Sequence, residues 1–486
     1  MILRSSPSTA RILTRPLISG SVSARHFSAA SAVSLNMAEH NSNQASGASL
    51  TAYKPRYIDI GINLADPIFR GRYHGKSRHP DDLKGVISRA IEVGCTKLLV
   101  TGSSFKSSRD ALKIAEEFPG TVFTTAGIHP CSSSIFSPSH HKHHDESQSE
   151  PEDPPEQHTP PCGPDPTKPI LDGEGVDHAR SATIISDLHQ LITTAPKSSL
   201  IAFGEFGLDY DRLHYCSKEV QLHSFSAQLS LAASLSPQLP LFLHSRAAHE
   251  DFVRLLKDAF GPKLEKLERG GAVHSFTGTI EEAKELMELG LYIGINGCSF
   301  KTEENCEVVR EIDLGKMMLE TDGPWCEVRP THEGWRYLVQ WEERGKKEEE
   351  EMKRAEEVER KKAEKIEAER RAQEEELEKK AAQLELGGDG GEKVEGEQGQ
   401  KRQRQPKKPK QQQQQTKKNQ KKENEVPDRF KVVKKEKWEE GAMVKGRNEP
   451  CTIERIARIV AGIKGVSVEE VCEAAWENTV KVFGPF

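Results

Sequence analysis

The sequence predicts an α/β fold, a (β/α)8 TIM barrel that carries two large low-complexity insertions and follows a disordered N-terminal presequence. The first observation is that eight short apolar or β-branched runs alternate with longer amphipathic stretches, as in repeated βα units. The second is length: the regions 57–130, 181–340 and 441–486, which remain after segments of unusual composition are removed, total 280 residues, the size of one barrel. An open doubly wound sheet is the second possibility.

Composition separates this body from the rest of the chain. Only 35% of the 486 residues are hydrophobic and 30% are charged, so a sizeable part of the chain does not bury a core. No run approaches the roughly 18–20 uncharged apolar residues of a membrane span, which excludes an integral membrane protein. The nine cysteines are scattered and never spaced C-x-x-C, so neither a disulfide framework nor a zinc ribbon is indicated.

The N-terminal segment 1–56 precedes the body. Residues 1–37 contain four arginines and many serines but no Asp, Glu or Lys, which is the composition of a mitochondrial transit peptide. Arg25-His26-Phe27-Ser28 is similar to a processing site. We therefore expect a mitochondrial protein, although a disordered basic tail is the alternative. Initiation at Met37 would supply a cytoplasmic or nuclear pool.

The first insertion spans 131–180. It holds nine prolines, ten acidic residues and three basic ones, together with the run His140-His141-Lys142-His143-His144. Nothing in it is periodic, so we expect a solvated loop, with metal binding by the histidines as the less favoured interpretation.

The second insertion spans 341–440, where 29 residues are Lys or Arg and 27 are Asp or Glu. Opposite charges recur three and four positions apart over 346–386 without a sustained apolar seam, which predicts a single solvated helix rather than a coiled coil. The sequence after it, including Lys401-Arg402-Gln403-Arg404 and Gln411 to Gln415, is basic and polar. A nuclear signal or a nucleic-acid patch is the alternative to a solvated charge run there.

The eight predicted strands fall in the first and central parts of the body, 57–130 and 181–340. They are 57–63, 97–101, 122–127, 200–205, 241–244, 271–275, 291–294 and 317–322. Amphipathic stretches between them predict helices over 81–93, 107–117, 218–235, 248–259 and 280–289.

Polar side chains that bind metals or protons follow nearly every predicted strand. In chain order they are Asp59, Asn63, His129, Glu205, His244, His274 and Asp322. The carboxyl ends of barrel strands meet at one mouth, so these side chains converge there, and Glu205, His244, His274 and Asp322 together predict a metal cage. Glu320 competes with Asp322 from the same face of the last strand, and we favour Asp322 because it lies nearer the mouth.

Motifs along the whole body then resemble those of the TatD-type deoxyribonucleases, metal-dependent hydrolases with a TIM barrel, and most closely their eukaryotic branch. The matching stretches are Asp59-Ile60-Gly61-Ile62-Asn63-Leu64, Asp66 to Gly71, Thr101-Gly102, Ala126 to Pro130, Gly204-Glu205, Gly207-Leu208-Asp209, His244-Ser245-Arg246, His274 to Gly278, Tyr292-Ile293-Gly294, Asn296 to Ser299, Glu320 to Trp325, and Arg447 to Pro450.

The resemblance implies a set of roles for the candidate residues. Glu205 would bridge two divalent cations, with His244 and His274 on one and Asp322 on the other. The His-x-His pair of many relatives is replaced here by Gly61 and Asn63, so one ion would have fewer protein ligands. The resemblance also implies Mg2+ as the cofactor, DNA as the partner and 3′–5′ exonuclease activity, whereas two imidazoles by themselves favour Zn2+ or Mn2+.

The chemistry assigns further candidate roles. Two cations can activate water and stabilise both oxygens of a phosphodiester displacement, and Asp322 is placed to accept the proton of the water. His129, Arg246 and Arg447 are candidates for holding the scissile phosphate, because Arg matches phosphate geometry. The sequence has no overall basic field, since its formal net charge is -6, so single strands or 3′ ends fit better than a long duplex.

Two other functions remain open at this point. The same cage would serve a hydrolase of a small amide, ester or cyclic amide, because a fold does not fix its substrate. A binding scaffold, in which the charged helix matters more than the barrel, is a third interpretation that the complete ligand set disfavours.

Overall fold

The computed structural model describes residues 53–138, 170–171, 175–385 and 426–486, with side chains described up to 381 in the long helix. The predicted presequence with Met37, the histidine run of the first insertion, and the basic and glutamine-rich tracts of the second insertion lie outside the described residues. No helix in the described ranges is long and apolar enough to cross a membrane.

Eight parallel strands form one sheet in the order β1-β4-β5-β6-β7-β8-β9-β10. Each of the eight predicted runs corresponds to one of them. Their bounds are β1 Tyr57–Ile62, β4 Cys95–Val100, β5 Val122–Ala126, β6 Leu200–Asp209, β7 Leu241–Arg246, β8 Gly271–Val273, β9 Tyr292–Ile295 and β10 Met317–Leu319. Two small sheets lie outside this one, β2 Arg72–Tyr73 with β3 Lys76–Ser77 and β11 Val432–Val433 with β12 Met443–Val444.

Hydrogen bonds just past the ends of the ladders join the first and last strands. The amide of Asp322 donates to the carbonyl of Gly61 over 2.7 Å, and the amide of Asn63 donates to the carbonyl of Gly323 over 2.9 Å. The sheet is therefore nearly closed, which confirms the predicted barrel over the open sheet.

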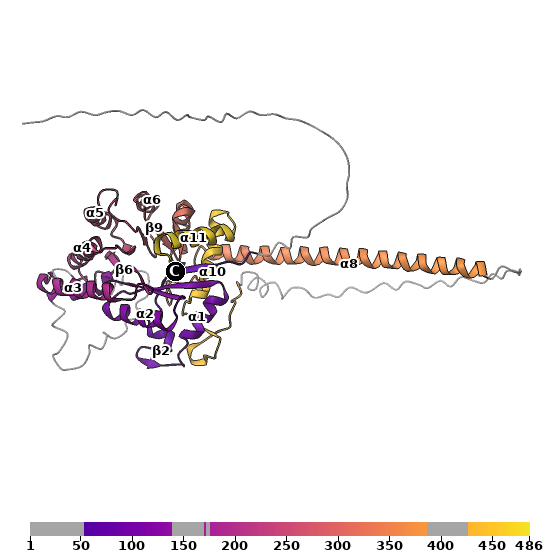
Figure 1. Cartoon of the computed structure of the whole chain (residues 1–486), viewed down its shortest axis with the longest axis horizontal. Coiled ribbons are helices and arrows are strands. Elements are labelled where there is room, and N and C mark those ends of the chain that lie inside the picture. The colour runs from indigo at the N-terminus through magenta and orange to yellow at the C-terminus, as the bar shows by residue number, and fades with distance from the viewer. Residues whose placement is uncertain (1–52, 139–169, 172–174, 386–425) are drawn as a thin grey trace, which may run out of the picture. The chain divides into compact units, whose positions relative to one another are not determined.

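Helices surround this sheet (Figure 1). All five predicted helices are present. The long helices are α1 Leu83–Glu92, α2 Phe105–Glu117, α3 His178–Thr194, α4 Lys218–Ser234, α5 His249–Phe260, α6 Ile280–Glu288, α7 Glu303–Glu311, α8 Trp335–Glu385, α10 Ile453–Lys464 and α11 Val468–Phe483. Short 3-10 turns are η1 Pro67–Arg70, η2 Pro130–Phe136, η4 Tyr210–Arg212, η5 Gly297–Phe300, η6 Leu314–Lys316, η7 Lys435–Lys437 and η8 Pro450–Thr452.

An apolar cluster fills the barrel interior below the predicted site. Every strand of the eight-stranded sheet contributes to this cluster, and Val482 and Phe483 of α11 complete it. Phe242 and Ala272 belong to this cluster, and two residues later come His244, on β7, and His274, directly after β8. Because strand side chains alternate between faces, both imidazoles continue the inward-facing rows and stand directly above the apolar layer.

The two insertions begin and end at positions other than those predicted. Helix α8 is a solvated single helix as expected: Leu338 near its start is buried, whereas Ile366 and Leu377 are each 66% exposed. The stretch 426–440, which we assigned to the insertion, instead packs on the barrel through Val426 and carries β11 and η7. Likewise, η2 occupies the start of the segment 131–180. Charge content alone does not reveal the few apolar anchors in these stretches.

Candidate metal centre

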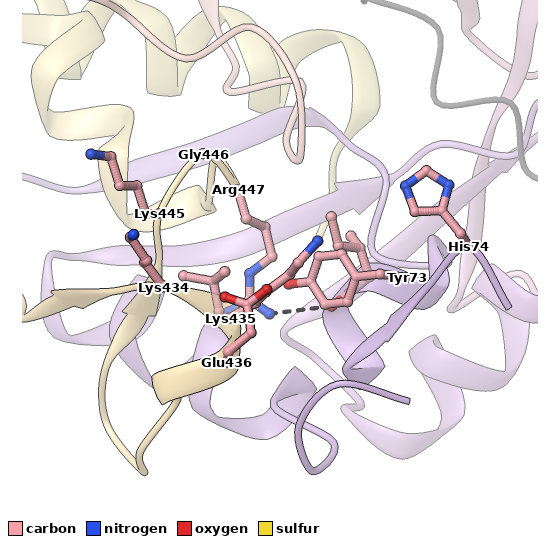
Figure 2. Close-up of a pocket in the computed structure, with 10 residues that line it drawn as sticks. Tyr73, His74, Lys434, Lys435, Glu436, Lys445, Gly446 and Arg447 are labelled. Carbon is pink, nitrogen blue, oxygen red and sulfur yellow. Dashed lines mark hydrogen bonds between the residues drawn. The ribbon is translucent and has the colours of Figure 1, made fainter. Parts of the chain in front are cut away.

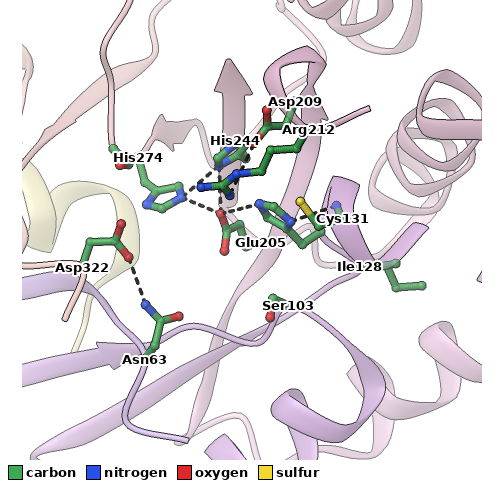
Figure 3. A network of polar contacts seen from close by, with 12 residues as sticks. Asn63, Ser103, Ile128, Cys131, Glu205, Asp209, Arg212, His244, His274 and Asp322 are labelled. Atoms are coloured by element: carbon green, nitrogen blue, oxygen red, sulfur yellow. Dashed lines mark hydrogen bonds and ion pairs between the residues drawn. The ribbon is translucent and has the colours of Figure 1, made fainter. Parts of the chain in front are cut away.

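Glu205 lies at the centre of the polar network at the barrel mouth (Figure 3). Its Oε1 atom lies 3.0 Å from Nδ1 of His244, 2.6 Å from Nε2 of His274 and 3.3 Å from Nε2 of His129. All four side chains are buried. The structure thus brings together three of the four predicted ligands, and His129 with them.

His244 is held so that one ring nitrogen faces the cluster. Its Nε2 lies 3.2 Å from Oδ2 of Asp209, and its Nδ1 faces Glu205 and lies 3.4 Å from Nε2 of His274. Burial alone would raise the pKa of Asp209, but the hydrogen bond with His244 and the charges of Arg212 and Arg246 hold that pKa below its usual range. An ionised Asp209 accepts the Nε2 proton, which leaves the Nδ1 lone pair for a metal.

His274 lies between two carboxylates. Its Nε2 faces Glu205, and its Nδ1 lies 3.4 Å from Oε2 of Glu320, while its ring stacks on Phe242 at a centroid distance of 4.7 Å. Burial opposes protonation of the ring, but Glu205 and Glu320 outweigh it and raise the pKa of His274 well above its usual value. In the metal-free protein, a proton on this imidazole therefore neutralises part of the carboxylate charge.

His129 differs from the other two histidines in its hydrogen bonding. Its Nδ1 accepts a 3.0 Å hydrogen bond from the backbone amide of Cys131 at the start of η2. Burial lowers the pKa of His129 to about 3, so the ring is neutral and its proton lies on Nε2. His129 is therefore a hydrogen-bond donor at the mouth, directed at Glu205 when no other acceptor is present.

Asp322 follows β10 and stands on the side of the site next to β1. Its Oδ1 accepts a 2.9 Å hydrogen bond from Nδ2 of Asn63, and its Oδ2 lies 3.2 Å from the thiol of Cys326. Burial raises the pKa of Asp322 to about 6; the positive charge of His274 opposes this rise, and Glu320 adds to it. Its φ of 51° is in the left-handed region, where a residue with a side chain is held at some cost in free energy.

Glu320, the competitor for the role of Asp322, is fully buried beneath the mouth. Its Oε1 accepts hydrogen bonds from the amide of Ser275 over 2.5 Å and from Nδ2 of Asn296 over 3.0 Å. A Cβ atom at Gly61 would lie 2.6 Å from Oε2 of Glu320. The carboxylate of Glu320 thus occupies the space beside β1 that a side chain at position 61 would need.

The residues at the mouth fit a divalent cation. Atoms of His129, Glu205 and His244 lie within 4.8 Å of one another, and because Nε2 of His129 carries its proton, the ligand atoms of this group are those of Glu205 and His244. The 3.4 Å between Nδ1 of His244 and Nε2 of His274 matches the edge of a tetrahedron around an ion bound at about 2.0–2.1 Å to nitrogen. Imidazole and carboxylate donors on separate strands, with Asp209 oriented behind His244, form the donor set of a metal centre.

The family comparison agrees with this geometry. The model of the family described as TatD related DNase matches residues 58–384. A curated relative named Deoxyribonuclease Tat-D, from Schizosaccharomyces pombe, is 35% identical over 429 residues, covering 88% of this chain and 95% of the relative. The chain belongs to the TatD-related DNase family. The predicted family and the predicted class of enzyme are thereby confirmed.

Two further comparisons extend the family match. A bacterial TatD from Pantoea sp., named 3'-5' ssDNA/RNA exonuclease TatD, is 33% identical over 278 residues, covering 57% of this chain and 82% of the relative. The crystal structure of an uncharacterized amidohydrolase from Saccharomyces cerevisiae superposes with a TM-score of 0.59 at 28% identity, covering 88% of this chain and all of that one. The TatD-related barrel is therefore the fold of the whole described body.

The two arginines predicted to hold phosphate lie in different places. Arg246 ends β7 beside Asp209 and is buried next to the cluster. Arg447 is buried, and its guanidinium is paired with Asp82 and, over 2.8 Å, with Glu449 instead of extending to Glu205. The sequence does not reveal the pairing with Asp82, because Asp82 lies 365 positions away along the chain.

The sequence analysis assigned no role to three residues of this TatD-related site. Asp209 supports His244, Nη1 of Arg212 lies 3.5 Å from Oδ2 of Asp209, and Cys326 contacts Asp322. The sequence could have predicted that Asp209 belongs to the site, because it lies four residues after Glu205 on the same strand face. Arg212 and Cys326 reach the site from turns, whose side-chain directions follow no sequence period.

Proposed function

We propose that this TatD-related chain is a 3′–5′ exodeoxyribonuclease that uses two divalent cations, with Mg2+ as the working ion. The observation that carries the proposal is the meeting of Glu205 with ring nitrogens of His244 and His274 at the carboxyl ends of three strands. This is the place where barrel enzymes carry out their chemistry.

Each residue of the centre has a distinct part. Oxygens of Glu205 would serve both ions, Nδ1 of His244 and Nε2 of His274 would hold one, and Asp322 would hold the other. When bound, the cations supply Lewis acidity to the scissile phosphate and to the attacking water. Asp322, with its pKa raised to about 6, is largely ionised at neutral pH and accepts the proton of that water.

The donors around the cage orient the phosphate. The Nε2 proton of neutral His129 is available to a phosphate oxygen once a cation engages Glu205. Arg246 and Arg212 add positive charge on the β6–β7 side of the centre, since both lower the pKa of Asp209. These three residues replace the predicted contribution of Arg447 to the binding of the scissile group.

The polarity and the preference for single strands rest on the name of the bacterial relative, which also includes RNA. The metal identity rests on the family resemblance, and the imidazole ligands should make Mn2+ or Zn2+ bind more tightly than Mg2+.

End-labelled single-stranded DNA, duplex DNA and RNA oligonucleotides, incubated with each metal and then with chelator, test the proposal. We expect a ladder that shortens from the 3′ end, that chelator stops it, and that Glu205→Gln abolishes it. Internal cuts would retain the nuclease and reject the polarity. A blank result for metal-loaded wild type would reject the nuclease in favour of a small-molecule hydrolase, which a panel of amides and esters would then identify.

We also propose mitochondrial import, on the composition of residues 1–37. A fusion of residues 1–40 to a fluorescent reporter should enter mitochondria, and replacement of its four arginines by glutamine should leave the reporter cytosolic. A wild-type fusion that stays cytosolic would overturn this.

A further inference from the structure

Apart from the metal centre, a hollow of about 340 Å³ lies between the β1–α1 and β10–α10 connections (Figure 2). One wall comes from η1 and the β2–β3 hairpin and includes Tyr73. The other comes from the segment 434–447, which follows the second insertion. Figure 2 places Lys434 and Lys445 on one side of Arg447 and Tyr73, and His74 on the other.

The lining of this hollow is strongly basic. Lys434, Lys435 and Lys445 line it with a single carboxylate, that of Glu436, and the charge of Arg447 is already paired with Asp82 and Glu449. In the part of the chain that the structure describes, none of the three lysines makes an ion pair, although the whole chain has a net charge of -6. Unpaired positive charge concentrated in a concave surface attracts an anion.

The lining of the hollow also includes a hydrogen-bond donor that has no acceptor among the described residues. The side chain of Arg447 is 1% exposed and is anchored by Asp82 and Glu449, yet its Nε has no hydrogen-bond partner among the described residues. A buried donor without an acceptor is unfavourable, so an acceptor bound in the hollow is favoured. Lys435 is positioned over the Tyr73 ring, its Nζ 4.9 Å from the ring centre, which fixes one lysine at the wall.

The segment that carries Arg447 is hydrogen-bonded to the segment that carries Asp322. Asn448, the residue after Arg447, donates hydrogen bonds through Nδ2 to the carbonyls of Thr321 over 2.9 Å and Trp325 over 2.8 Å. These two residues flank the stretch that begins with Asp322. Both walls belong to connections at the carboxyl ends of strands, so the hollow and the metal centre open at the same end of the barrel.

We propose that this hollow binds a backbone phosphate of the substrate DNA strand, away from the bond that is cut. The proposal deepens the exonuclease function proposed above and rests on it. Lysine charges recognise phosphate without reading sequence, which suits an enzyme that removes successive nucleotides. The hollow would hold the strand while its 3′ end occupies the metal centre.

A binding measurement separates this proposal from the catalytic one. Fluorescence anisotropy with a labelled single-stranded oligonucleotide is measured on full-length Glu205→Gln, which should not cut the strand, with and without Lys434→Gln and Lys445→Gln. Both lysines lie at the surface, so the changes spare the fold. The matched control is Lys263→Gln with Lys266→Gln, two exposed lysines in the α5–β8 connection at the opposite end of the barrel.

We expect Kd to rise about fivefold at 0.1 M salt for each lysine that no longer binds a phosphate, and the slope of log Kd against log salt to fall by about 0.7 per lysine. The control pair should leave both quantities unchanged. Equal Kd and slope in the Lys434/Lys445 variant would overturn the proposal, even if the wild-type protein cleaves DNA. If the Lys434/Lys445 variant binds DNA more weakly but the wild-type protein cleaves no DNA, the anion site is kept and the nuclease function is rejected.

Discussion

The side-chain amide of Asn63 donates a 2.9 Å hydrogen bond to Oδ1 of Asp322, across the seam where the first and last strands of the barrel meet. The same two residues take part in the backbone hydrogen bonds that close the seam. By the family resemblance, Asn63 stands where many relatives carry the second histidine of a His-x-His pair. Its role here is therefore to orient the carboxylate of Asp322, and the seam of the barrel forms part of the site.

Removing this hydrogen bond should impair catalysis more than folding. In Asn63→Ala, Asp322 loses one of its hydrogen-bond donors and its fixed orientation. We therefore expect kcat to fall about tenfold to a hundredfold, which corresponds to a rise of roughly 1.4–2.8 kcal/mol in the activation free energy. Steady-state kinetics and thermal unfolding would measure both effects. Asn305→Ala removes only the Oδ1 acceptor for the Thr302 amide at the start of α7 and is the control, which should leave kcat unchanged. An equal loss of kcat in both variants would contradict the positioning role of Asn63.

Asp209 offers a second test, because it supports a ligand without being one. Asp209→Asn weakens the acceptor for Nε2 of His244 and frees the ring to change tautomer, so metal affinity should fall about tenfold to a hundredfold. Isothermal titration with Mn2+ would measure it. Asp251→Asn removes a carboxylate that pairs with Lys218 and Arg254 outside the centre, and it should leave Mn2+ affinity as in wild type. An unchanged affinity in Asp209→Asn would mean that His244 is not a ligand.

The pH dependence of metal binding follows from His274 and Asp322. The pKa of His274 is raised well above its usual value by Glu205 and Glu320 despite burial, so the metal-free protein carries a proton there at neutral pH. Metal binding must release that proton, and affinity should rise with pH, about tenfold per unit for each proton displaced. Below pH 6 Asp322, whose burial raises its pKa to about 6, adds a second proton and steepens the dependence.

Calorimetry at pH 7.5 and pH 5.5, in buffers of different ionisation enthalpy, counts these protons directly. We expect about one proton released at the higher pH and about two at the lower. Glu320→Gln removes one of the carboxylates that raise the pKa of His274, so it should reduce proton release at pH 7.5. Affinity that is constant from pH 5.5 to 8 would refute this assignment.

Periodic features of this chain were predictable from the sequence, and contacts between turns were not. Glu205, His244 and His274 are on strands or directly after them, where alternation fixes the face of each side chain. The direction of the Arg447 side chain depends on its ion pair with Asp82 in a distant connection, and no local sequence pattern predicts such a partner. The packed stretch 426–440 was missed for a similar reason, because a few apolar anchors are hidden in a strongly charged composition.

Restoring the missing histidine should harm the protein instead of improving its metal site. In Gly61→His, the new Cβ would lie 2.6 Å from Oε2 of Glu320 and 3.4 Å from the Phe242 ring, so overpacking should cost about 1–3 kcal/mol. Thermal unfolding and Mn2+ titration would follow stability and affinity. Gly175→His is the control, since nothing lies within 4 Å of its Cβ position. Combining Gly61→His with Glu320→Ala should recover part of the loss, and strict additivity of the two changes would contradict the steric explanation.

The boundary of the second insertion can be tested by two deletions that differ by only 15 residues. Replacing 346–425 by a flexible linker of about 20 Gly and Ser residues should leave thermal unfolding and DNA cleavage close to wild type, because the removed part of α8 is solvated. Extending the deletion to 440 also removes buried Val426 and half-buried Trp438, and the Trp438 ring stacks on His79 at a centroid distance of 5.2 Å. Removing this packing, together with the ion pair between Asp428 and Arg455, should lower Tm by several degrees, since about 1 kcal/mol corresponds to about 2–4 °C in a domain of this size. Equal Tm values for the two deletion variants would return the boundary of the insertion to 440. A loss of cooperative unfolding in the shorter deletion would instead mean that the charged helix stabilises the barrel.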